Sequence, residues 1–440
     1  MLRRLAFHAE HAIKGVIFDC HACGQCVLRK TAMICPMRCP KGLRNGPCGG
    51  TLGGRCEVHP ERKCIWVRID LGRHGARLAT PPILPATNAR LHHTASIGNL
   101  LSGADAQARV PLAPLATAPD AASAPLVTAS RLEAALKSGR FVVTTEIRTP
   151  RSPVLTRLER EGALLRDHFD AVNATAFRNG CPSLPSSTAA AALSRLGLET
   201  IAQATGRDHT RATFIGELMA CQLAGVRNVL CLTGDYQSGE RIARPVFDLD
   251  SSLMLYEARH LRDRSRIFST GEEVANAPRQ FLGCAINPLT TPVQVPVRRL
   301  LQKAAAGAEF VQSQVVTSAA QLAPFMAQYV AAGLDRRLHF IAGIPVVIGR
   351  KALERLPRVP GVLVDPAFAA RLAAAQDLRQ EGVAAAIDLV RAIAALPGVR
   401  GVHLMLFGLD HHALIDVRQG LRDLSPVVGL QSTVVPAAVS

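Results

Sequence analysis

The chain has 440 residues, enough for two or three domains, or for one barrel of about 250 residues with an attachment. Hydrophobic residues make up 48% of it, which excludes a wholly disordered chain. The net charge is +17, and 44 of the 51 basic residues are Arg. Aromatic residues make up only 4%, so few rings are available to stack on bases, and no nucleic-acid partner is expected. The positive charge predicts attraction to anions such as polyglutamates, phosphates or an acidic protein.

The N-terminal region carries no signal for a membrane or for export. No run of about 18 apolar residues occurs, so no membrane span is expected. Residues 1–18 contain Arg3 and Arg4 but no continuous apolar segment before Cys20, so a secretory signal is not expected either. These features predict a cytoplasmic protein.

Residues 1–70 are predicted to form a Cys-rich metal-binding module. Eight of the 12 cysteines fall in this module, and in a long chain without an export signal such clustering favours metal over disulfides. The first three have the C-x2-C-x2-C spacing of an iron–sulfur ligand set, with a fourth ligand elsewhere. The other five suffice for a second four-thiolate site. Zinc also takes four thiolates, so iron–sulfur and zinc both stay open. The predicted ligands are Cys20, Cys23, Cys26, Cys35, Cys39, Cys48, Cys56 and Cys64.

Two further predictions concern segments without a clear pattern. Residues 71–130 are rich in Ala, Pro and small polar residues, with no apolar period, and are predicted to be a flexible linker. The remaining cysteines are predicted to be small buried hydrophobic residues: Cys181, Cys221, Cys231 and Cys284.

Residues 131–416 show a regular alternation of short β-branched apolar runs and stretches with helical period. Eight such β-then-α units predict a closed parallel (β/α)8 TIM barrel, followed by a tail over 417–440. An open doubly wound sheet is the rival, but the chain lacks the G-x-G-x-x-G turn typical of that fold. The predicted strands are 141–147, 170–175, 200–205, 228–235, 280–287, 310–316, 339–348 and 401–408. Helices are predicted at 156–167, 188–197, 211–225, 292–307, 318–333 and 367–395.

In such a barrel the chemistry lies at the carboxyl ends of the strands. Glu146 and Asp235 are the carboxylates at these ends. Glu146 suits general acid catalysis, because burial at a strand end raises the pKa of a carboxyl group toward neutrality. Gly234, directly before Asp235, allows the backbone to approach a planar ligand closely.

The strand-end segments together resemble the methylenetetrahydrofolate reductase family over about residues 131–408. The most specific segment is AGVRNVLCLTGD at 224–235, and the others are TTEIRTP (144–150), VNATAF (172–177), IAQATGRDHTR (201–211), KAAAGAEFVQSQVV (303–316) and AGIPVV (342–347). The resemblance implies a flavin-dependent enzyme that interconverts 5,10-methylenetetrahydrofolate and 5-methyltetrahydrofolate. It makes Glu146 the acidic catalyst, and it makes Asp235 the carboxylate that faces flavin and pterin.

The same resemblance implies which residues contact the cofactor and the substrate. The implied FAD-binding residues are Thr175, Thr205, Gly234, Asp235 and Lys303, the last of them at a cofactor phosphate. The implied substrate-binding residues are Gln314 and Asn287. Two positions depart from the family pattern: Gln203 replaces a His near the cofactor, and Asn287 replaces an aromatic residue. These departures predict a site that does not use NAD(P)H directly.

The N-terminal module resembles the small Cys-rich partner found fused to, or in complex with, bacterial reductases of this family. The resemblance implies an iron–sulfur cluster, zinc or both, and electrons that reach the flavin through the module or from an electron-transfer protein partner. Two other functions stay open: a pterin or corrinoid methyltransferase barrel, and a folate-binding adaptor for an electron-transfer complex. The sequence gives no indication of the oligomeric state.

Overall fold

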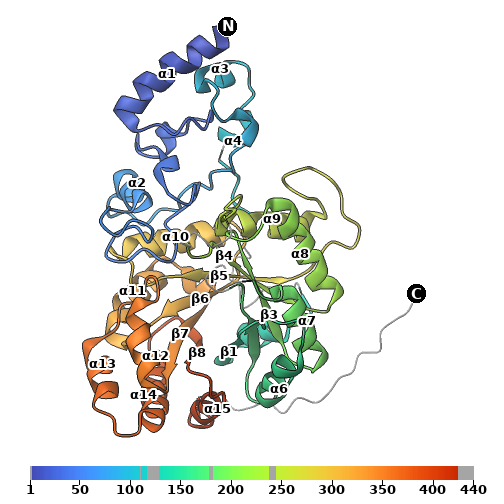
Figure 1. Ribbon diagram of the computed structural model, residues 1–440, viewed down its shortest axis with the longest axis vertical. Helices are drawn as coiled ribbons and strands as arrows, with labels where there is room; N and C mark the ends of the chain where they lie inside the picture. Colours follow the sequence, from blue (N-terminus) through green and yellow to red (C-terminus); the bar gives the residue numbers. More distant parts are fainter. Residues whose placement is uncertain (1, 110, 116–127, 178–181, 237–243, 425–440) are drawn as a thin grey trace.

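The computed structural model describes residues 2–109, 111–115, 128–177, 182–236 and 244–424. It contains a barrel and, at the top of the view in Figure 1, an N-terminal module that lies against one end of this barrel. Within the described segments, no helix combines the length and the hydropathy needed to cross a membrane.

The predicted (β/α)8 barrel is confirmed. Eight parallel strands pair in chain order and close between the first and the last. They are β1 (Val142–Ile147), β2 (Ala171–Ala174), β3 (Thr200–Thr205), β4 (Asn228–Leu232), β5 (Phe281–Ile286), β6 (Phe310–Val315), β7 (His339–Val347) and β8 (Val399–Phe407). Every one is buried along most of its length, as expected for strands that face the barrel interior on one side and helices on the other.

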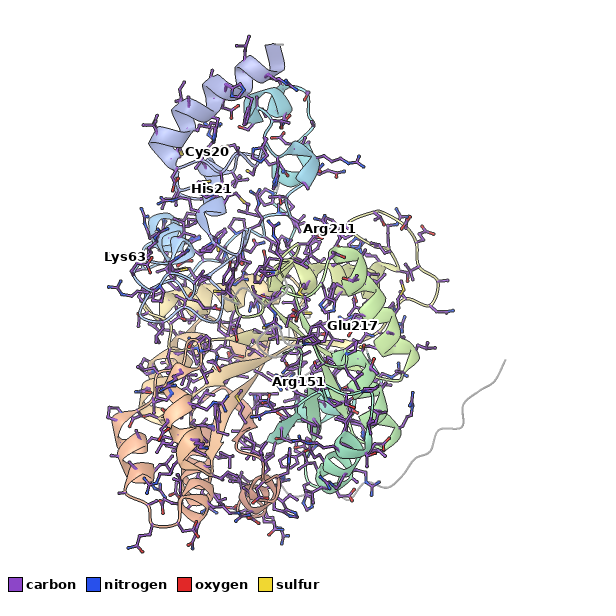
Figure 2. The ribbon with its side chains drawn as sticks, viewed as in Figure 1. Cys20, His21, Lys63, Arg151, Arg211 and Glu217 are labelled. Atoms are coloured by element: carbon purple, nitrogen blue, oxygen red, sulfur yellow. The ribbon has the colours of Figure 1, made fainter. Side chains whose placement is uncertain are left out.

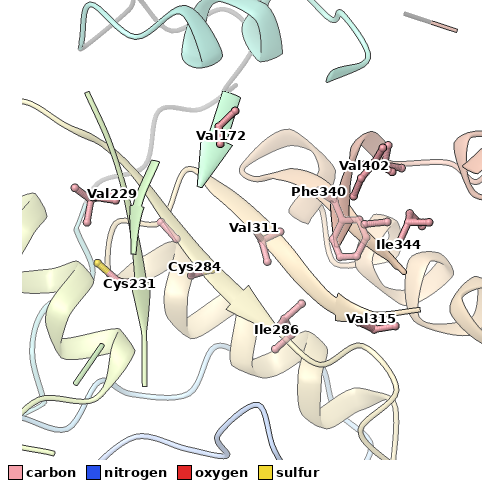
Figure 3. Close-up of a cluster of buried hydrophobic side chains, with 14 of the residues drawn as sticks. Val172, Val229, Cys231, Cys284, Ile286, Val311, Val315, Phe340, Ile344 and Val402 are labelled. Atoms are coloured by element: carbon pink, nitrogen blue, oxygen red, sulfur yellow. The ribbon is translucent and has the colours of Figure 1, made fainter. Parts of the chain in front are cut away.

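The main core lies between the strands and the surrounding helices. Val229, Val311 and Phe340 are among the side chains that the strands contribute to it (Figure 3). Cys231 and Cys284 lie in the same core (Figure 3), and Cys221 on α8 (Arg211–Leu223) is buried there too, as the sequence predicted. Cys181 lies outside the described residues.

Five of the six predicted helices match helices of the barrel, one is broken in two, and four further helices (131–137, 251–264, 350–355 and 412–419) lie where none was named. The expected helix over 367–395 is broken, because Asp377 caps the start of a separate helix. Residues 251–264 form a helix that was not predicted, and Asp250 caps it in the same way. The helices are α5 (Arg131–Lys137), α6 (Thr156–Leu165), α7 (Ser186–Arg195), α8 (Arg211–Leu223), α9 (Ser251–Arg264), α10 (Gln294–Ala305), α11 (Ala319–Ala331), α12 (Arg350–Arg355), α13 (Pro366–Ala373), α14 (Leu378–Ala394) and α15 (His412–Gln419).

The module begins with α1 (Leu2–Phe18) and ends with α2 (Ile65–His74). Between these helices the chain is mostly irregular and holds the eight clustered cysteines. A small core of its own includes Trp66 and Leu43, and Val295 of the barrel helix α10 packs into this core. The module therefore shares part of its hydrophobic core with the barrel.

The described part of segment 71–130 is packed, which corrects the prediction of a flexible linker there. It contains α3 (Ser96–Leu101) and α4 (Ala106–Arg109). Ile83 pairs with Leu112 in a short bridge and is buried in the main barrel core, while Leu84 is buried in the module core. The segment therefore joins the two cores, and its apolar residues lose surface to both of them.

Candidate active site

A cavity of about 1030 Å³ lies at the carboxyl ends of the barrel strands. This volume is at the upper end of the range for ligand sites, so it has room for two ring systems. Seven of the eight residues predicted to serve catalysis, cofactor or substrate line it: Glu146, Thr175, Thr205, Gly234, Asp235, Lys303 and Gln314.

Glu146 faces a histidine that the sequence did not single out. Its Oε2 lies 3.7 Å from Nε2 of His403, a nearly buried residue of β8. On the other side of the imidazole ring, Nδ1 lies 3.0 Å from the hydroxyl of Thr144, and this hydroxyl donates to the Val402 carbonyl. A hydroxyl that donates elsewhere accepts from Nδ1–H, which leaves Nε2 of a neutral ring as an acceptor toward Glu146. At 3.7 Å the carboxyl group and the ring are neighbours but stand beyond hydrogen-bond distance.

Asp235 faces the same cavity from the end of β4. Water in the cavity reaches its side chain, but protein surrounds it closely, so burial raises the pKa of the carboxyl group. The nearby Glu57 carboxylate raises this pKa further, while Lys41 and Arg207 favour the ionised form. Gly234 has a φ of +87°, and a Cβ there would lie 2.8 Å from Cβ of Arg207, so this turn requires glycine.

The two threonines are tied into the loops that follow their strands. The Thr175 hydroxyl accepts from the Thr149 backbone amide at 3.4 Å, and the Thr205 hydroxyl donates to Asp208. Arg207 also binds Asp208, with Nε 2.8 Å from Oδ1, and it donates to the Phe177 carbonyl at 2.6 Å. This network fixes the cavity wall between β2 and β4 before any ligand binds.

Lys303 reaches the cavity from α10 between strands β4 and β5. Its ammonium group is almost fully buried and donates to the Ala285 carbonyl. Burial lowers the pKa of Lys303 to about 8. Gln314, at the end of β6, lines the cavity while its amide nitrogen donates to the Pro360 carbonyl at 2.9 Å.

Asn287, which was predicted to bind substrate, is not among the residues that line the cavity. Its side-chain amide is buried and donates to the carbonyl oxygens of Gly49, Thr51 and Gly361. Gly361 has a φ of +77°, and a Cβ there would lie 2.5 Å from the Gly49 oxygen. The amide is therefore committed to holding a module loop close against the barrel.

The module forms part of the cavity wall. Pro47, Cys48 and Gly49 line the cavity together with Glu146 and Asp235. Behind them Lys41 and Glu57 make an ion pair of 2.7 Å, with both side chains more than 90% buried.

This ion pair is hydrogen-bonded to the loop after β4. Lys41 donates to the Gly234 carbonyl at 2.8 Å, and Glu57 accepts from the Tyr236 amide at 2.6 Å. The module therefore sets the position of the segment that carries Asp235.

The clustered cysteines separate into two groups of four. One cavity of about 30 Å³ is lined by Cys20, Cys23, Cys26 and Cys35, and one of about 780 Å³ by Cys39, Cys48, Cys56 and Cys64. Cys20 lies beneath α1, on the side of the module away from the barrel (Figure 2). Cys48 belongs to the other group and also lines the barrel cavity.

The chemistry of these sulfurs fits a cationic centre. Burial raises the pKa of the Cys39 thiol to about 11 and that of Cys48 to about 12, so a cation is needed to hold them as thiolates at neutral pH. In the described residues, no three His, Cys, Asp or Glu side chains meet at a point that could hold one metal ion.

Four residues of the site escaped the sequence analysis: His403, Arg207, Lys41 and Glu57. His403 lies on a predicted strand, two residues from Met405, which also lines the cavity, so the period-2 rule places both on the inner face. Arg207 follows β3 directly and was within reach of the same reasoning. Lys41 and Glu57 carry no such signal, because their role depends on contacts with residues about 180 or more positions away.

Comparison with known proteins gives two family matches. A family model described as "Methylenetetrahydrofolate reductase" matches residues 131–415, and one described as "Methylene-tetrahydrofolate reductase C terminal" matches residues 2–79. The second match therefore lies at the N-terminal end of this chain. A search of curated proteins found no match.

Comparison with solved structures gives matches of low similarity. An uncharacterized protein from Clostridium thermocellum, described as binding two copies of 5-methyl-5,6,7,8-tetrahydrofolic acid, is 12% identical, with a TM-score of 0.48 over 67% of this chain and 99% of that chain. EDTA monooxygenase from Chelativorans sp. BNC1 is also 12% identical, with a TM-score of 0.41 over 65% of this chain and 93% of that chain. Likeness at this level is no guide to function. The family match over 131–415 spans more than half of the chain, and the protein therefore belongs to the methylenetetrahydrofolate reductase family, whose barrel enzymes act on folates.

Proposed function

We propose that this protein interconverts 5,10-methylenetetrahydrofolate and 5-methyltetrahydrofolate with FAD bound in the barrel cavity, and that the module exchanges electrons with that site. The observation that carries the proposal is one cavity that brings together Glu146, Asp235 and Cys48 in a barrel of this family. An acid, a pterin-orienting carboxylate and a sulfur of the metal-binding module then meet in one site.

Glu146 supplies the proton that opens the methylene bridge of the substrate. The open form is an iminium ion, whose carbon accepts hydride. His403 lines the cavity beside this carboxyl group and can return a proton to it after each turnover. Thr144 holds the imidazole ring in position for this transfer.

Asp235 orients the pterin by accepting hydrogen bonds from its ring nitrogens. Lys41 and Arg207 favour the ionised carboxylate that this role requires. A negative charge at this point also favours departure of hydride from a neighbouring ring toward the cationic iminium carbon.

The cavity residues fit FAD in size and in donor chemistry. Thr175, Thr205 and the Gly234 turn lie along one wall, where a flat ring can approach the backbone. Lys303 and Arg207 supply positive charge for a pyrophosphate. FAD, when bound there, would supply the hydride chemistry that protein side chains lack.

The cysteine group around the 780 Å³ cavity fits an iron–sulfur cluster better than a single zinc ion. A zinc ion draws four sulfurs to within about 2.3 Å of one point, whereas the thiolates of a cluster bind different iron atoms and stand further apart. The cysteines surround cavities and do not meet at a point. A cluster, when bound, would supply one-electron steps.

The first test is composition and colour. Protein purified without oxygen should carry flavin, show the broad visible absorption of iron–sulfur clusters and contain iron in excess of zinc. A protein that binds no flavin or iron and still reduces methylenetetrahydrofolate fully would overturn the proposal. A colourless protein that transfers the methyl group of 5-methyltetrahydrofolate instead would favour a pterin or corrinoid methyltransferase.

The second test is Glu146→Gln, which keeps the shape of the side chain but cannot supply a proton. We expect it to retain FAD and to lose folate turnover by on the order of 10²-fold or more. His403→Gln should keep FAD. It should slow folate turnover mainly at pH values where the return of a proton to Glu146 limits the rate, so the pH dependence of turnover should change. Near-normal methylenetetrahydrofolate reduction by Glu146→Gln would remove this residue from the mechanism.

A further inference from the structure

The loop after β4, which carries Asp235, is held at two points by the N-terminal module. At the first point Nζ of Lys41 donates to the Gly234 carbonyl at 2.8 Å. There the Glu57 carboxylate also accepts from the Tyr236 backbone amide at 2.6 Å. These two contacts fall on either side of Asp235 in the chain, and the 2.7 Å ion pair between Lys41 and Glu57 joins them. One buried ion pair of the module therefore spans the residues before and after this carboxylate.

The second point is Phe247, which lies further along the same loop. Its ring packs against the module core, and Nζ of Lys41 lies 5.6 Å from the centre of this ring, as in a cation–π contact. Phe247 has a φ of +45°, which a residue with a side chain rarely adopts and which persists where the surroundings impose it. Its backbone amide donates to the Gly206 carbonyl of the barrel at 2.9 Å. Module and barrel together therefore hold the loop in a conformation that is costly for the loop alone.

Lys41 and Glu57 are in turn held by the barrel-side cysteine group, which consists of Cys39, Cys48, Cys56 and Cys64. The backbone amide of Lys41 lies against the sulfur of Cys39 and favours its thiolate form. Glu57 follows Cys56 directly in the chain, and its Oε2 accepts from the Cys48 thiol at 3.5 Å. The side chains of Lys41 and Glu57 also line the cavity that the four cysteines surround.

A metal centre on these sulfurs would fix the backbone that carries Lys41 and Glu57. In small Cys-rich modules the metal orders the chain around its ligands, because the complete site does not exist before the metal binds. A folate beside Asp235 needs the loop after β4 in one position, and this loop is held by the same ion pair. Two ligands that order one segment favour each other, and the effect is the same in both directions.

We propose that Lys41 and Glu57 couple the barrel-side cysteine group to the folate site, so that the protein binds folate tightly when a metal centre occupies this group and weakly when none does. Both are positioning residues, because they hold the loop that carries Asp235. The inference rests on the proposed function in that a metal centre binds these cysteines and a folate lies beside Asp235. It requires neither reduction of the folate nor electron transfer.

The first test removes one centre at a time. Cys39→Ser/Cys56→Ser disrupts the barrel-side group, and Cys23→Ser/Cys26→Ser disrupts the other group. None of these four cysteines is among the residues that line the barrel cavity. Calorimetry without oxygen, in the presence of FAD, measures the affinity for 5-methyltetrahydrofolate. We expect it to be about tenfold weaker in the first variant and within about twofold of wild type in the second. Equal affinity in the first variant and wild type, or no binding to wild type, would overturn the coupling.

The second test changes Lys41 while the cysteines stay intact. Lys41→Met removes the donor to the Gly234 carbonyl and should weaken 5-methyltetrahydrofolate binding about tenfold in protein that carries as much iron as wild type. Lys41→Arg keeps a cation and should recover part of the affinity. Lys63→Met is the matched control, because Lys63 lines the same cavity beside Cys64 but is exposed at the outer edge of the module (Figure 2). A control that loses as much affinity as Lys41→Met would assign the effect to charge near the cysteines and overturn the role of Lys41.

The reciprocal measurement follows iron instead of folate. It uses Cys23→Ser/Cys26→Ser protein, whose iron comes from the barrel-side group, and a chelator that turns coloured when it takes up iron. Saturating 5-methyltetrahydrofolate should slow iron release about tenfold, and by less than about twofold once Lys41→Met is added. Iron release that folate leaves unchanged would overturn the proposal. A protein that shows this coupling but does not reduce methylenetetrahydrofolate would instead overturn the proposed reaction and leave the coupling in place.

Discussion

Lys303 has a charge that can respond to what the cavity holds. Burial lowers its pKa to about 8, against an ordinary value of 10.5, because the ammonium group has little contact with water. An anion that binds beside it favours the charged form and raises this pKa again. Binding of a phosphate-containing cofactor should therefore be coupled to proton uptake by this one side chain.

The prediction is a pH-dependent affinity for FAD. Below pH 8 the lysine is already charged in the free protein, so affinity should be flat. Between pH 8 and about pH 10 binding must bring a proton, and the affinity should fall, by at most tenfold per pH unit. Lys303→Met should bind FAD more weakly below pH 8, by roughly 1–3 kcal/mol for one charge-assisted bond, and should lose the pH dependence. Fluorescence titration of the apoprotein with FAD measures the affinity and its pH dependence. An equal pH dependence in wild type and variant would show that Lys303 does not pair with the phosphate of FAD.

Residues whose position follows from the barrel itself could be predicted from sequence, and residues held by the module could not. Glu146 and Asp235 stand at strand ends, so the rule for parallel barrels placed both in the cavity. Asn287 also stands at a strand end but turns away, because its amide satisfies carbonyl groups of a loop some 240 residues earlier. No local pattern in the sequence encodes that contact.

At the scale of elements, helices α2 and α10 join the module to the barrel. Arg298 on α10 is fully buried, and its Nε lies 2.9 Å from Oδ2 of Asp70 on α2. The same guanidinium group donates to the carbonyl oxygens of Gly75 and Arg77, just after the end of α2. One arginine therefore binds a buried carboxylate and two carbonyl groups that follow a helix, and removal of Asp70 would leave its charge without this counterion.

We expect Asp70→Ala to cost about 3–5 kcal/mol, the usual result of removing one partner of a buried pair. Trp66, the only tryptophan, lies buried in α2 and reports on this contact. Its fluorescence should change at lower urea in the variant than in wild type. Asp19→Ala, which breaks an exposed ion pair with Arg38, is the control and should change stability by less than about 1 kcal/mol. Equal urea midpoints for wild type and Asp70→Ala would show that the interface does not depend on this pair.

The strands were predictable because each is a short apolar run that is buried on both faces, and their bounds agree with the prediction to within a few residues. The segment before the barrel was not predictable in the same way. Its low charge and many prolines are typical of a linker, but Ile83 and Leu84 are buried through contacts with two different cores. Composition indicates how a segment behaves in isolation, but it does not predict the tertiary contacts that the segment makes.

At the scale of the whole molecule, the module is docked and its position is part of the active site. Its core includes Val295 of the barrel helix α10, its Lys41 binds the loop after β4, and its Cys48 lies in the cavity wall. Electrons would then pass between module and barrel inside one fixed structure. A module that swings on its linker would instead meet the flavin at a rate set by its effective concentration, which falls as the linker lengthens.

These two cases predict different responses to a longer connection. We expect an insertion of 20 Gly and Ser residues between Ala121 and Ala122 to leave the transfer rate unchanged. The protein is first reduced with dithionite, and a desalting column then removes the reductant, all without oxygen. Methylenetetrahydrofolate is added, and the transfer rate is measured as the recovery of the iron–sulfur absorbance. Asp70→Ala weakens the docking contact and should make the rate sensitive to the same insertion, because the module then spends time away from the cavity.

Two cysteine variants compare the two cysteine groups. Cys23→Ser changes a cysteine of the group far from the barrel, and Cys48→Ser changes the one in the cavity wall. Cys48→Ser should slow recovery more for the same loss of iron. A rate that falls severalfold on insertion into the otherwise unchanged chain would mean that the module acts by swinging, and recovery that never occurs would mean that no electrons pass from the module to the folate.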